Sequence, residues 1–501
     1  MKTISKQNLI AAALVGALSL CGCATQKLSQ DSRYEQLANA PFPGGYPAAE
    51  SVAPLKNELF FEQAAQSYIW SLPAVNMWAM KEGSEKVFGA GYNVLPYWPK
   101  RLTAQTLVTT PNSDVIYAMS YLDLKQDGPL VVEAPRGVQG LFDDFWQRPL
   151  VGPTIDGHTW VGDVGFAGPD KGHGGTYILL PPDYTGEVPT DGFVYRSRTY
   201  NVFLFWRSFF KDPNDLSQAD EIIRQTKVYP LGKKDQAKPM VFPDANALPA
   251  NMLFPQDGNY FDMLSRFIDA EYADPADEYM RTVLKMIGIE KGKPFHPDPA
   301  MKTLLDQAAK TAFKMTRVMA NDMSVQEPDG LYYPDRQWVN VFPGQDPFFR
   351  GNLLERTLYF TLAYGMSPGM AVSMVDKGAK YPGVFRDKDG DYLEGDQSYM
   401  LHLPPNVPAA NFWSVTLYDA LTASGLDNGP PYPSINSMDK PTENADGSFD
   451  LYFGPTAPAG MGKNWMRTVP GKGYFVLLRL YSPMQSFFDE TWKPDDVIKV
   501  K

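Results

Sequence analysis

Short apolar runs separated by turn residues dominate residues 115–210. Each run is rich in β-branched or aromatic side chains and is bounded by Gly, Pro, Asn or Asp, which is typical of strands. The pattern predicts strands over Val115–Tyr121, Pro129–Glu133, Thr176–Leu180 and Asn201–Trp206. Their spacing favours an antiparallel sandwich or barrel.

Helical periodicity flanks this region on both sides. Before it, apolar residues recur near the 3.6-residue period at Leu59, Phe60, Ala64, Tyr68 and Leu72. They predict a helix that ends at Pro73, because proline has no N–H to donate. After it, the same period predicts helices over Tyr260–Tyr272, Asp277–Ile287, Ala300–Asp322 and Pro347–Tyr364. Strand patterns then return over Asn411–Tyr418, Ser448–Phe453 and Tyr474–Tyr481.

The order β, α, β predicts an α+β multidomain protein, with two antiparallel β-sandwich or jelly-roll-like domains joined by a mostly helical region. Residues 24–54 are polar and then rich in Pro, Gly and Ala, without a periodic apolar face, and are interpreted as a tether. The expected divisions are a signal peptide (1–22), a lipidated tether (23–55), an N-terminal helix plus β-sandwich domain (56–210), a helical region (211–378) and a C-terminal β-sandwich domain (379–501).

Composition excludes several classes of protein. With 41 Gly and 44 Pro in 501 residues, a long helical bundle or coiled coil is excluded, and 13% aromatic residues exclude general disorder. The 46 basic and 57 acidic residues give a net charge of −11. Because phosphate binding needs clustered Lys and Arg, this balance argues against nucleic acid and against an anionic membrane surface as partners.

Residues 1–23 have the parts of a secretory signal. Lys2 and Lys6 precede an apolar stretch from Leu9 to Leu20, which is too short to cross a bilayer as a folded helix. The following Leu20-Cys21-Gly22-Cys23 resembles a bacterial lipobox, which implies cleavage before Cys23 and its lipidation. Ordinary signal-peptidase cleavage is the alternative.

Ala24, directly after Cys23, resembles the sorting pattern of outer-membrane lipoproteins. We therefore expect a bacterial cell-envelope protein at the outer membrane, facing the periplasm or the exterior, with the lipid anchor as its only membrane contact. The sequence leaves the oligomeric state open.

Several motifs of common catalytic sites do not occur in the sequence. Both cysteines lie in the signal segment, so the rest of the chain has no thiol for a disulfide, a metal or covalent catalysis. His-Glu-x-x-His, Gly-Lys-Ser/Thr and Gly-x-Gly-x-x-Gly do not occur. No cofactor and no metal is predicted. Carboxylates alternate around Gly390 between Asp387 and Glu394, which fits either a tight turn or a calcium loop.

Arg479 is the most unusual polar residue in a predicted strand. Alternation places it on one face with Phe475, Leu477 and Tyr481, and the opposite face is apolar too. The guanidinium is therefore expected to be partly buried and to need an acidic or carbonyl partner, with Asp419 as a candidate. It either ties the structure together or holds an anion.

Asp144 and His402 are the candidate bases. Asp144 follows Asp143, and paired carboxylates can raise one pKa, although an ion pair with Arg148 explains Asp144 equally well. His402 ends the run Tyr399-Met-Leu-His402, where it is either a satisfied core or loop histidine or a base. His158 lies in a glycine-rich loop and is a weaker candidate for the same role.

Asn112 and Asp114, just before a predicted strand, are candidate ligand-binding residues. In the alternative interpretation they only cap the turn, by accepting hydrogen bonds from nearby backbone amides. Three aromatic side chains are expected to form apolar walls of the site, namely Trp146, Trp413 and Tyr418.

Two regions resemble known families of unknown function. Residues 65–210 resemble domain of unknown function 1254, and 380–500 resemble domain of unknown function 1214. The first resemblance rests on Tyr68-Ile-Trp-Ser-Leu-Pro73, Thr110-Pro-Asn-Ser-Asp-Val-Ile-Tyr117, Leu122-Asp-Leu124, the Asp144-Phe-Trp146 region and Tyr177-Ile-Leu-Leu-Pro-Pro182. The second rests on Tyr399-Met-Leu-His402, Phe412-Trp-Ser-Val-Thr-Leu-Tyr-Asp419, Asn464-Trp465, Leu478-Arg-Leu-Tyr-Ser-Pro483 and Trp492-Lys-Pro494. The resemblance implies two β-sandwich-like domains joined by helices, and no agreed activity.

Two functional hypotheses follow. In the first, an envelope protein binds a small molecule in an aromatic-lined cleft where the β-domains meet or face the helices. It hydrolyses the ligand if His402 or Asp144 activates water while Arg479 holds the developing negative charge. In the second, a non-enzymatic envelope module binds a glycan, a peptide edge or a protein partner. Whether the protein is an enzyme stays open at this stage.

Overall fold

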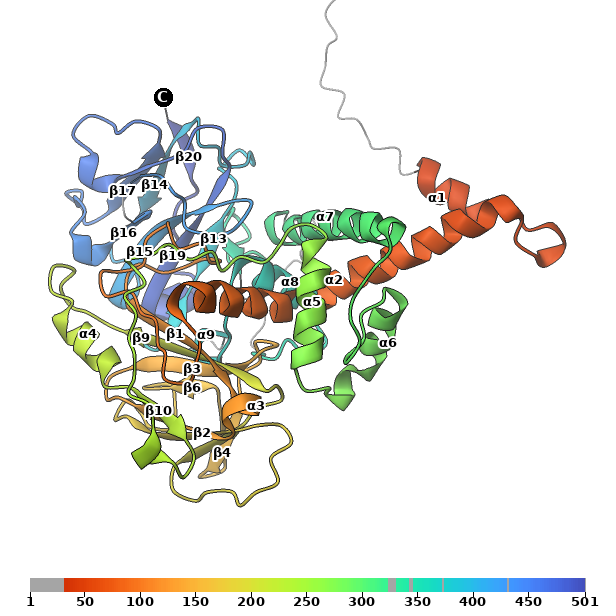
Figure 1. The fold of residues 1–501 in the computed structure, drawn as a ribbon. Helices are drawn as coiled ribbons and strands as arrows, with labels where there is room; N and C mark the ends of the chain where they lie inside the picture. The colour runs from red at the N-terminus through yellow and green to blue at the C-terminus, as the bar shows by residue number, and fades with distance from the viewer. Residues whose placement is uncertain (1–30, 323–329, 342–345, 372–373, 430–431, 501) are drawn as a thin grey trace, which may run out of the picture. The chain divides into compact units, whose positions relative to one another are not determined.

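The computed structural model describes residues 31–322, 330–341, 346–371, 374–429 and 432–500 (Figure 1). The predicted signal segment, including Cys23, lies outside these residues. The chain divides into two compact units, up to Phe61 and from Glu62 onward. In the first unit, helix α1 (Asp31–Ala38) is held by an ion pair between Arg33 and Glu58.

An N-terminal β-sandwich forms from two sheets with an apolar core between them. The first sheet has the order β1 (Ile116–Asp123), β9 (Asn201–Ser208), β3 (Gln139–Asp144) and β6 (Asp163–Val164). The second has the order β10 (Lys227–Pro230), β2 (Leu130–Ala134), β7 (Gly175–Leu180), β8 (Phe193–Arg196), β4 (Val151–Ile155) and β5 (His158–Val161). Val202, Leu204 and Trp206 of β9 lie in the core between these sheets. Phe203, Phe205 and Arg207 therefore point to the other face of the first sheet.

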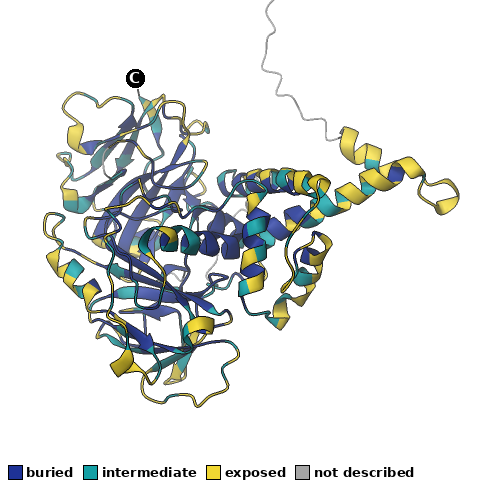
Figure 2. Cartoon of the chain, in the orientation of Figure 1, coloured by how far each residue is buried: buried dark blue, intermediate teal, exposed yellow. Residues whose placement is uncertain are grey.

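A C-terminal β-sandwich repeats this plan. Its first sheet has the order β11 (Val339–Asn340), β13 (Pro382–Val384), β19 (Tyr474–Pro483), β15 (Ala409–Asp419) and β16 (Ser434–Asn436), and β12 (Ala379–Lys380) also pairs with β19. The other has the order β18 (Trp465–Arg467), β17 (Phe449–Gly454), β14 (Ser398–Leu403) and β20 (Ile498–Val500). Val476, Leu478 and Leu480 of β19 lie in the core between the sheets, which leaves Arg479 on the outer face. Figure 2 shows the strands of both domains as largely buried.

The other helices are α2 (Ala49–Phe88), α3 (Leu124–Asp127), α4 (Ser217–Arg224), α5 (Asn259–Ala270), α6 (Glu278–Met286), α7 (Pro299–Asn321), α8 (Leu353–Leu362), α9 (Pro368–Ala371) and α10 (Gln485–Phe488). Short 3₁₀ turns cover Pro43–Gly45, Lys234–Gln236, Pro275–Asp277, Ser437–Asp439 and Gly462–Asn464. Within the described ranges, no helix combines the length and apolar character needed to cross a membrane.

The predicted end of the first helix at Pro73 is wrong, because α2 continues to Phe88. Proline removes the one backbone donor that would bond the Ile69 carbonyl four residues earlier, and side chains from other elements hold the helix on both sides of this point. Arg356 donates to the carbonyl of Trp70 at 2.8 Å, and Gln147 donates to that of Pro73 at 2.7 Å. The α+β class and the predicted strands and later helices are confirmed to within a few residues, except that the last helix, predicted from Pro347, begins only at Leu353.

Gly140 of β3 sets the distance between β3 and β9. It lies opposite Trp206, and a Cβ atom there would come within 2.1 Å of the Trp206 ring and 2.2 Å of the Phe205 carbonyl. We expect Gly140→Ala to lower the midpoint of thermal unfolding clearly, because overpacking a core of this kind costs about 1–3 kcal/mol. Gly462→Ala, where a Cβ meets open space, is the matched control. Equal midpoints for the two variants would contradict the argument.

Candidate functional site

A cavity of about 1370 Å³ lies between the outer faces of the two β-sandwiches. Tyr117, Phe205 and Arg207 line it from the N-terminal sheet, and residues of β19, including Leu477 and Arg479, line it from the C-terminal sheet. The alternation that buries one face of β9 and of β19 in the two sandwich cores therefore turns the other faces toward this cavity.

Arg479 is 3% exposed, and neutral groups accept its hydrogen bonds. It donates to the hydroxyl of Thr416 at 3.1 Å and to the carbonyls of Thr110 and Pro111 at 3.3 Å. The expected carbonyl partner is thus confirmed. The suggestion that Asp419 is the partner of Arg479 is wrong, because Asp419 forms an ion pair with Lys472 at 2.9 Å.

Arg207 provides a second guanidinium on the opposite wall. It is partly buried, lies opposite Tyr117 in the register of β1 and β9, and packs 4.7 Å from the centre of the Phe205 ring. Within the part of the chain that the structure describes, neither Arg207 nor Arg479 forms an ion pair with a carboxylate. Burial raises the pKa of the Tyr117, Tyr364 and Tyr481 phenols beside them. These phenols stay neutral, so the two positive charges are not cancelled.

The charge of the cavity lining is opposite to that of the chain. Among the residues that the structure describes, five cationic side chains line it, namely Lys171, Arg207, Lys211, Lys377 and Arg479. The carboxylates in this described part of the lining are Asp163 and Asp376. In a protein with a net charge of −11, this excess creates a local positive potential suited to an anion.

Asp163 is the buried carboxylate of the cavity wall. It is 6% exposed and its Oδ2 accepts a hydrogen bond from the backbone N–H of Gly369 at 2.8 Å. Burial raises the pKa of Asp163 to about 7, against hydrogen bonds from Ser367 and Gly369 and the charge of Arg207, which lower it. Asp163 therefore changes its charge near neutral pH.

The turn over residues 110–114 forms part of the cavity wall and contacts the C-terminal sheet. Asn112 lines the cavity and donates to the Tyr481 hydroxyl, while its own Oδ1 caps the turn by accepting from the Asp114 N–H at 2.7 Å. Tyr418 is fully buried outside the cavity lining and donates to the Pro111 carbonyl at 2.6 Å. The turn is thus held by side chains of the C-terminal domain.

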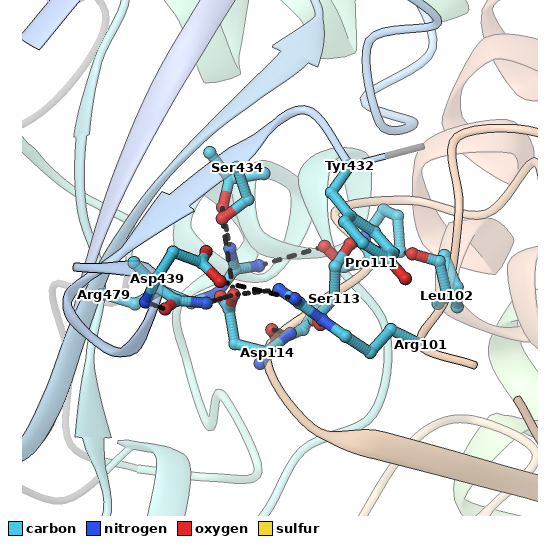
Figure 3. A network of polar contacts seen from close by, with 12 residues as sticks. Arg101, Leu102, Pro111, Ser113, Asp114, Tyr432, Ser434, Asp439 and Arg479 are labelled. Atoms are coloured by element: carbon cyan, nitrogen blue, oxygen red, sulfur yellow. Dashed lines mark hydrogen bonds and ion pairs between the residues drawn. The ribbon is translucent and has the colours of Figure 1, made fainter. Parts of the chain in front are cut away.

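Asp114 is the centre of the polar network in Figure 3. It is 1% exposed and accepts hydrogen bonds from Asn436 at 2.8 Å and from Arg101 at 3.3 Å. Arg101 stacks over the Tyr432 ring at 4.1 Å and lies 3.7 Å from Asp439. Asp114 does not line the cavity; it connects the domains.

The other residues proposed from the sequence lie elsewhere. Asp144 pairs with Arg148 at 2.7 Å, and Trp146 packs against Trp70 with ring centres 4.4 Å apart. Trp413 lines a separate hollow of about 330 Å³. His402 points outward from β14 and its Nδ1 lies 2.6 Å from Asp450.

In the predicted turn around Gly390, Asp387 accepts hydrogen bonds from the backbone N–H groups of Asp389 and Asp391, each at 3.0 Å. Across the described ranges, no cluster of three or more His, Cys, Asp or Glu side chains is placed to hold a metal ion.

Sequence reasoning missed Arg207 and Asp163. The signal for Arg207 was present, because Phe203, Phe205 and Arg207 alternate along their strand as Phe475, Leu477 and Arg479 do. Asp163 had no such signal, because only the tertiary fold brings strand β6 into contact with the 363–371 segment.

The fold and the cavity define a class: an α+β protein in which two β-sandwiches enclose a cationic, aromatic hollow. Residues 92–230 match the family model described as protein of unknown function DUF1254, and residues 378–485 match protein of unknown function DUF1214. The chain carries both domains in this order, which confirms the resemblance found in its motifs.

The crystal structure of the VPA0106 protein from Vibrio parahaemolyticus is similar in fold. Its TM-score is 0.52 at 18% identity, over 88% of this chain and 100% of that chain. An uncharacterized protein from Burkholderia cenocepacia gives a TM-score of 0.38 at 16% identity, over 93% and 98% of the two chains, which is too low to carry an argument. No curated protein matches the sequence.

The Asp114 network predicts a specific stability pattern. We expect Asp114→Ala to lower the free energy of unfolding by about 3 kcal/mol, because it leaves the buried Arg101 guanidinium with Asp439, 3.7 Å away, as its carboxylate partner. The double variant Arg101→Met, Asp114→Leu should lose less, since the buried cation is removed with its partner and the Asp439 side chain keeps 35% of its surface exposed to water. Denaturant unfolding measures both. Lys310→Ala, which removes an exposed pair with Asp306, is the control and should change little. A larger loss in the double variant would contradict this account.

Proposed function

We propose that this protein binds a small organic anion in the cavity between its two β-sandwiches. The observation that carries the proposal is the pair Arg207 and Arg479, whose charges face a large aromatic hollow without a carboxylate partner among the described residues. Guanidinium groups bind carboxylates and phosphates through directed, charge-assisted hydrogen bonds. The phenols of Tyr117 and Tyr481 supply further neutral donors.

Binding is better supported than hydrolysis by the bases proposed from the sequence. His402 and Asp144 do not line this cavity, and each has another partner. A hydrolytic step at this site would need a base from the cavity lining, such as Asp163 or His158, with Arg207 as the group that stabilises a developing oxyanion. Glycan, peptide-edge or protein binding remains the alternative, and the cationic lining gives it no particular support.

Removing either guanidinium tests the proposal directly. We expect the full chain to bind 2-naphthoate and not the neutral 2-naphthamide, as followed by ligand fluorescence. Arg207→Met and Arg479→Met should each weaken naphthoate binding at least tenfold, because a charge-assisted hydrogen bond contributes about 1.5–3 kcal/mol.

Arg467→Met is the matched control, since Arg467 is an exposed strand arginine outside the cavity. Unchanged affinity in both cavity variants, with folding verified by circular dichroism, would exclude the site. Equal binding of naphthoate and naphthamide would exclude recognition of the charge.

The pKa of Asp163 predicts how binding depends on pH. Asp163 is neutral below pH 7 and negative above it, so its charge appears next to Arg207 as the pH rises. Naphthoate affinity should therefore fall as the pH increases from about 6 to 8, and Asp163→Asn should flatten this dependence.

His158 is another titratable side chain of the cavity lining. His158→Gln is therefore the control and should leave the dependence in place. If naphthoate binding loses its pH dependence in His158→Gln and keeps it in Asp163→Asn, the dependence does not come from Asp163 and the prediction is wrong.

A further inference from the structure

The cavity is larger and more apolar than a compact anion requires. Its volume of about 1370 Å³ exceeds the roughly 300–1,000 Å³ of most small-molecule sites. Beside the two arginines, apolar side chains such as Phe205, Met370 and Leu477 form its walls. Because the cations occupy limited parts of this surface, a ligand that fills the cavity must bring a large apolar body as well as a charge.

The opening of the cavity is marked by exposed aromatic side chains. Phe166 is 73% exposed and Phe209 is 38% exposed, and both line the cavity. Residues that line a cavity while exposed to solvent lie where it opens. The lysines Lys171 and Lys211 come from the same two loops and are exposed as well. The opening is therefore apolar and cationic, while the buried Arg479 lies deeper.

We propose that the natural ligand class is an amphipathic anion with an unbranched alkyl chain, bound with its head group inward. The head, a carboxylate or a phosphate, contacts Arg207 and Arg479. The chain extends along Phe205, Met370 and Leu477 toward Phe166 and Phe209 at the opening. Burial of the chain removes apolar surface from water on both ligand and protein, which is the main source of affinity for such ligands. This inference rests on the proposed anion site and specifies what occupies it.

A series of alkyl chain lengths provides the test. Hexanoate, octanoate, decanoate and dodecanoate are titrated into the full chain by calorimetry, each below its micelle-forming concentration. The dissociation constant should fall about fourfold for each CH₂ that is buried, and at least twofold on average over the series. Decyl phosphate is compared with decanoate to identify the head group, and decanol is the neutral control.

The outcomes separate this inference from the proposed function. If naphthoate and hexanoate bind through the arginines and longer chains bind no more tightly, the alkyl-chain inference is wrong and the anion site stands. If decanol binds as tightly as decanoate, or no anion binds, the proposed function itself fails. A fall in dissociation constant with chain length, together with weaker binding of every acid of the series in Arg479→Met, supports both.

The aromatic side chains at the opening give an independent test. Phe166→Ser should weaken dodecanoate binding at least fivefold and leave hexanoate binding unchanged, because only the longer chain reaches the opening. Tyr279→Ser is the matched control, since Tyr279 is also an aromatic residue with 73% exposure and does not line the cavity. Equal weakening of hexanoate and dodecanoate in Phe166→Ser would overturn the head-inward orientation.

Discussion

The desolvated guanidinium of Arg479 is the group on which the arrangement of the two sandwiches depends. A buried cation is costly unless hydrogen-bond acceptors surround it. These acceptors come from both domains, the Thr416 hydroxyl from the C-terminal sheet and the carbonyls of Thr110 and Pro111 from the N-terminal turn. Separating the domains would leave the guanidinium without two of them. Because all three acceptors are neutral, the same contacts that fix the domains leave a positive charge at the cavity wall.

The two walls of the cavity are built by the same local rule. Strands β9 and β19 each bury one face in a sandwich core and carry aromatic or aliphatic residues and one arginine on the other. Each strand is central in its sheet, so its outer face is held rigidly by neighbours on both sides. A site on such strands is better preorganised than one on loops, because the backbone cannot move to accommodate the charge.

The segment that crosses between the domains, residues 363–371, is held by side-chain acceptors of the N-terminal domain. Gln147 accepts from the N–H of Gly365, Asp143 from that of Met366, and Asp163 from that of Gly369. Burial raises the pKa of Asp143 well above its ordinary value, as it also raises that of Asp163. Both carboxylates thus hold this segment in place through its backbone N–H groups, and Asp163 also lines the cavity.

Local pattern alone determined the strands, most of the helices and the face on which Arg479 lies, because alternation and the 3.6-residue period are properties of neighbouring residues. It also indicated that Arg479 needs a carbonyl or acidic partner, since burial follows from apolar neighbours on both faces. The partner itself, the extension of α2 through Pro73 and the role of Asp163 were decided by tertiary structure. Each of these three features depends on contacts between residues far apart in the chain. Gln147 and Arg356, for example, bind carbonyls of α2, and no local sequence pattern shows that they lie close to that helix. Trp146, Trp413 and His402 lie away from the large cavity for the same reason. The type of a residue shows that it could serve in a binding site, but the packing of the sheets decides which of these residues face the same cavity.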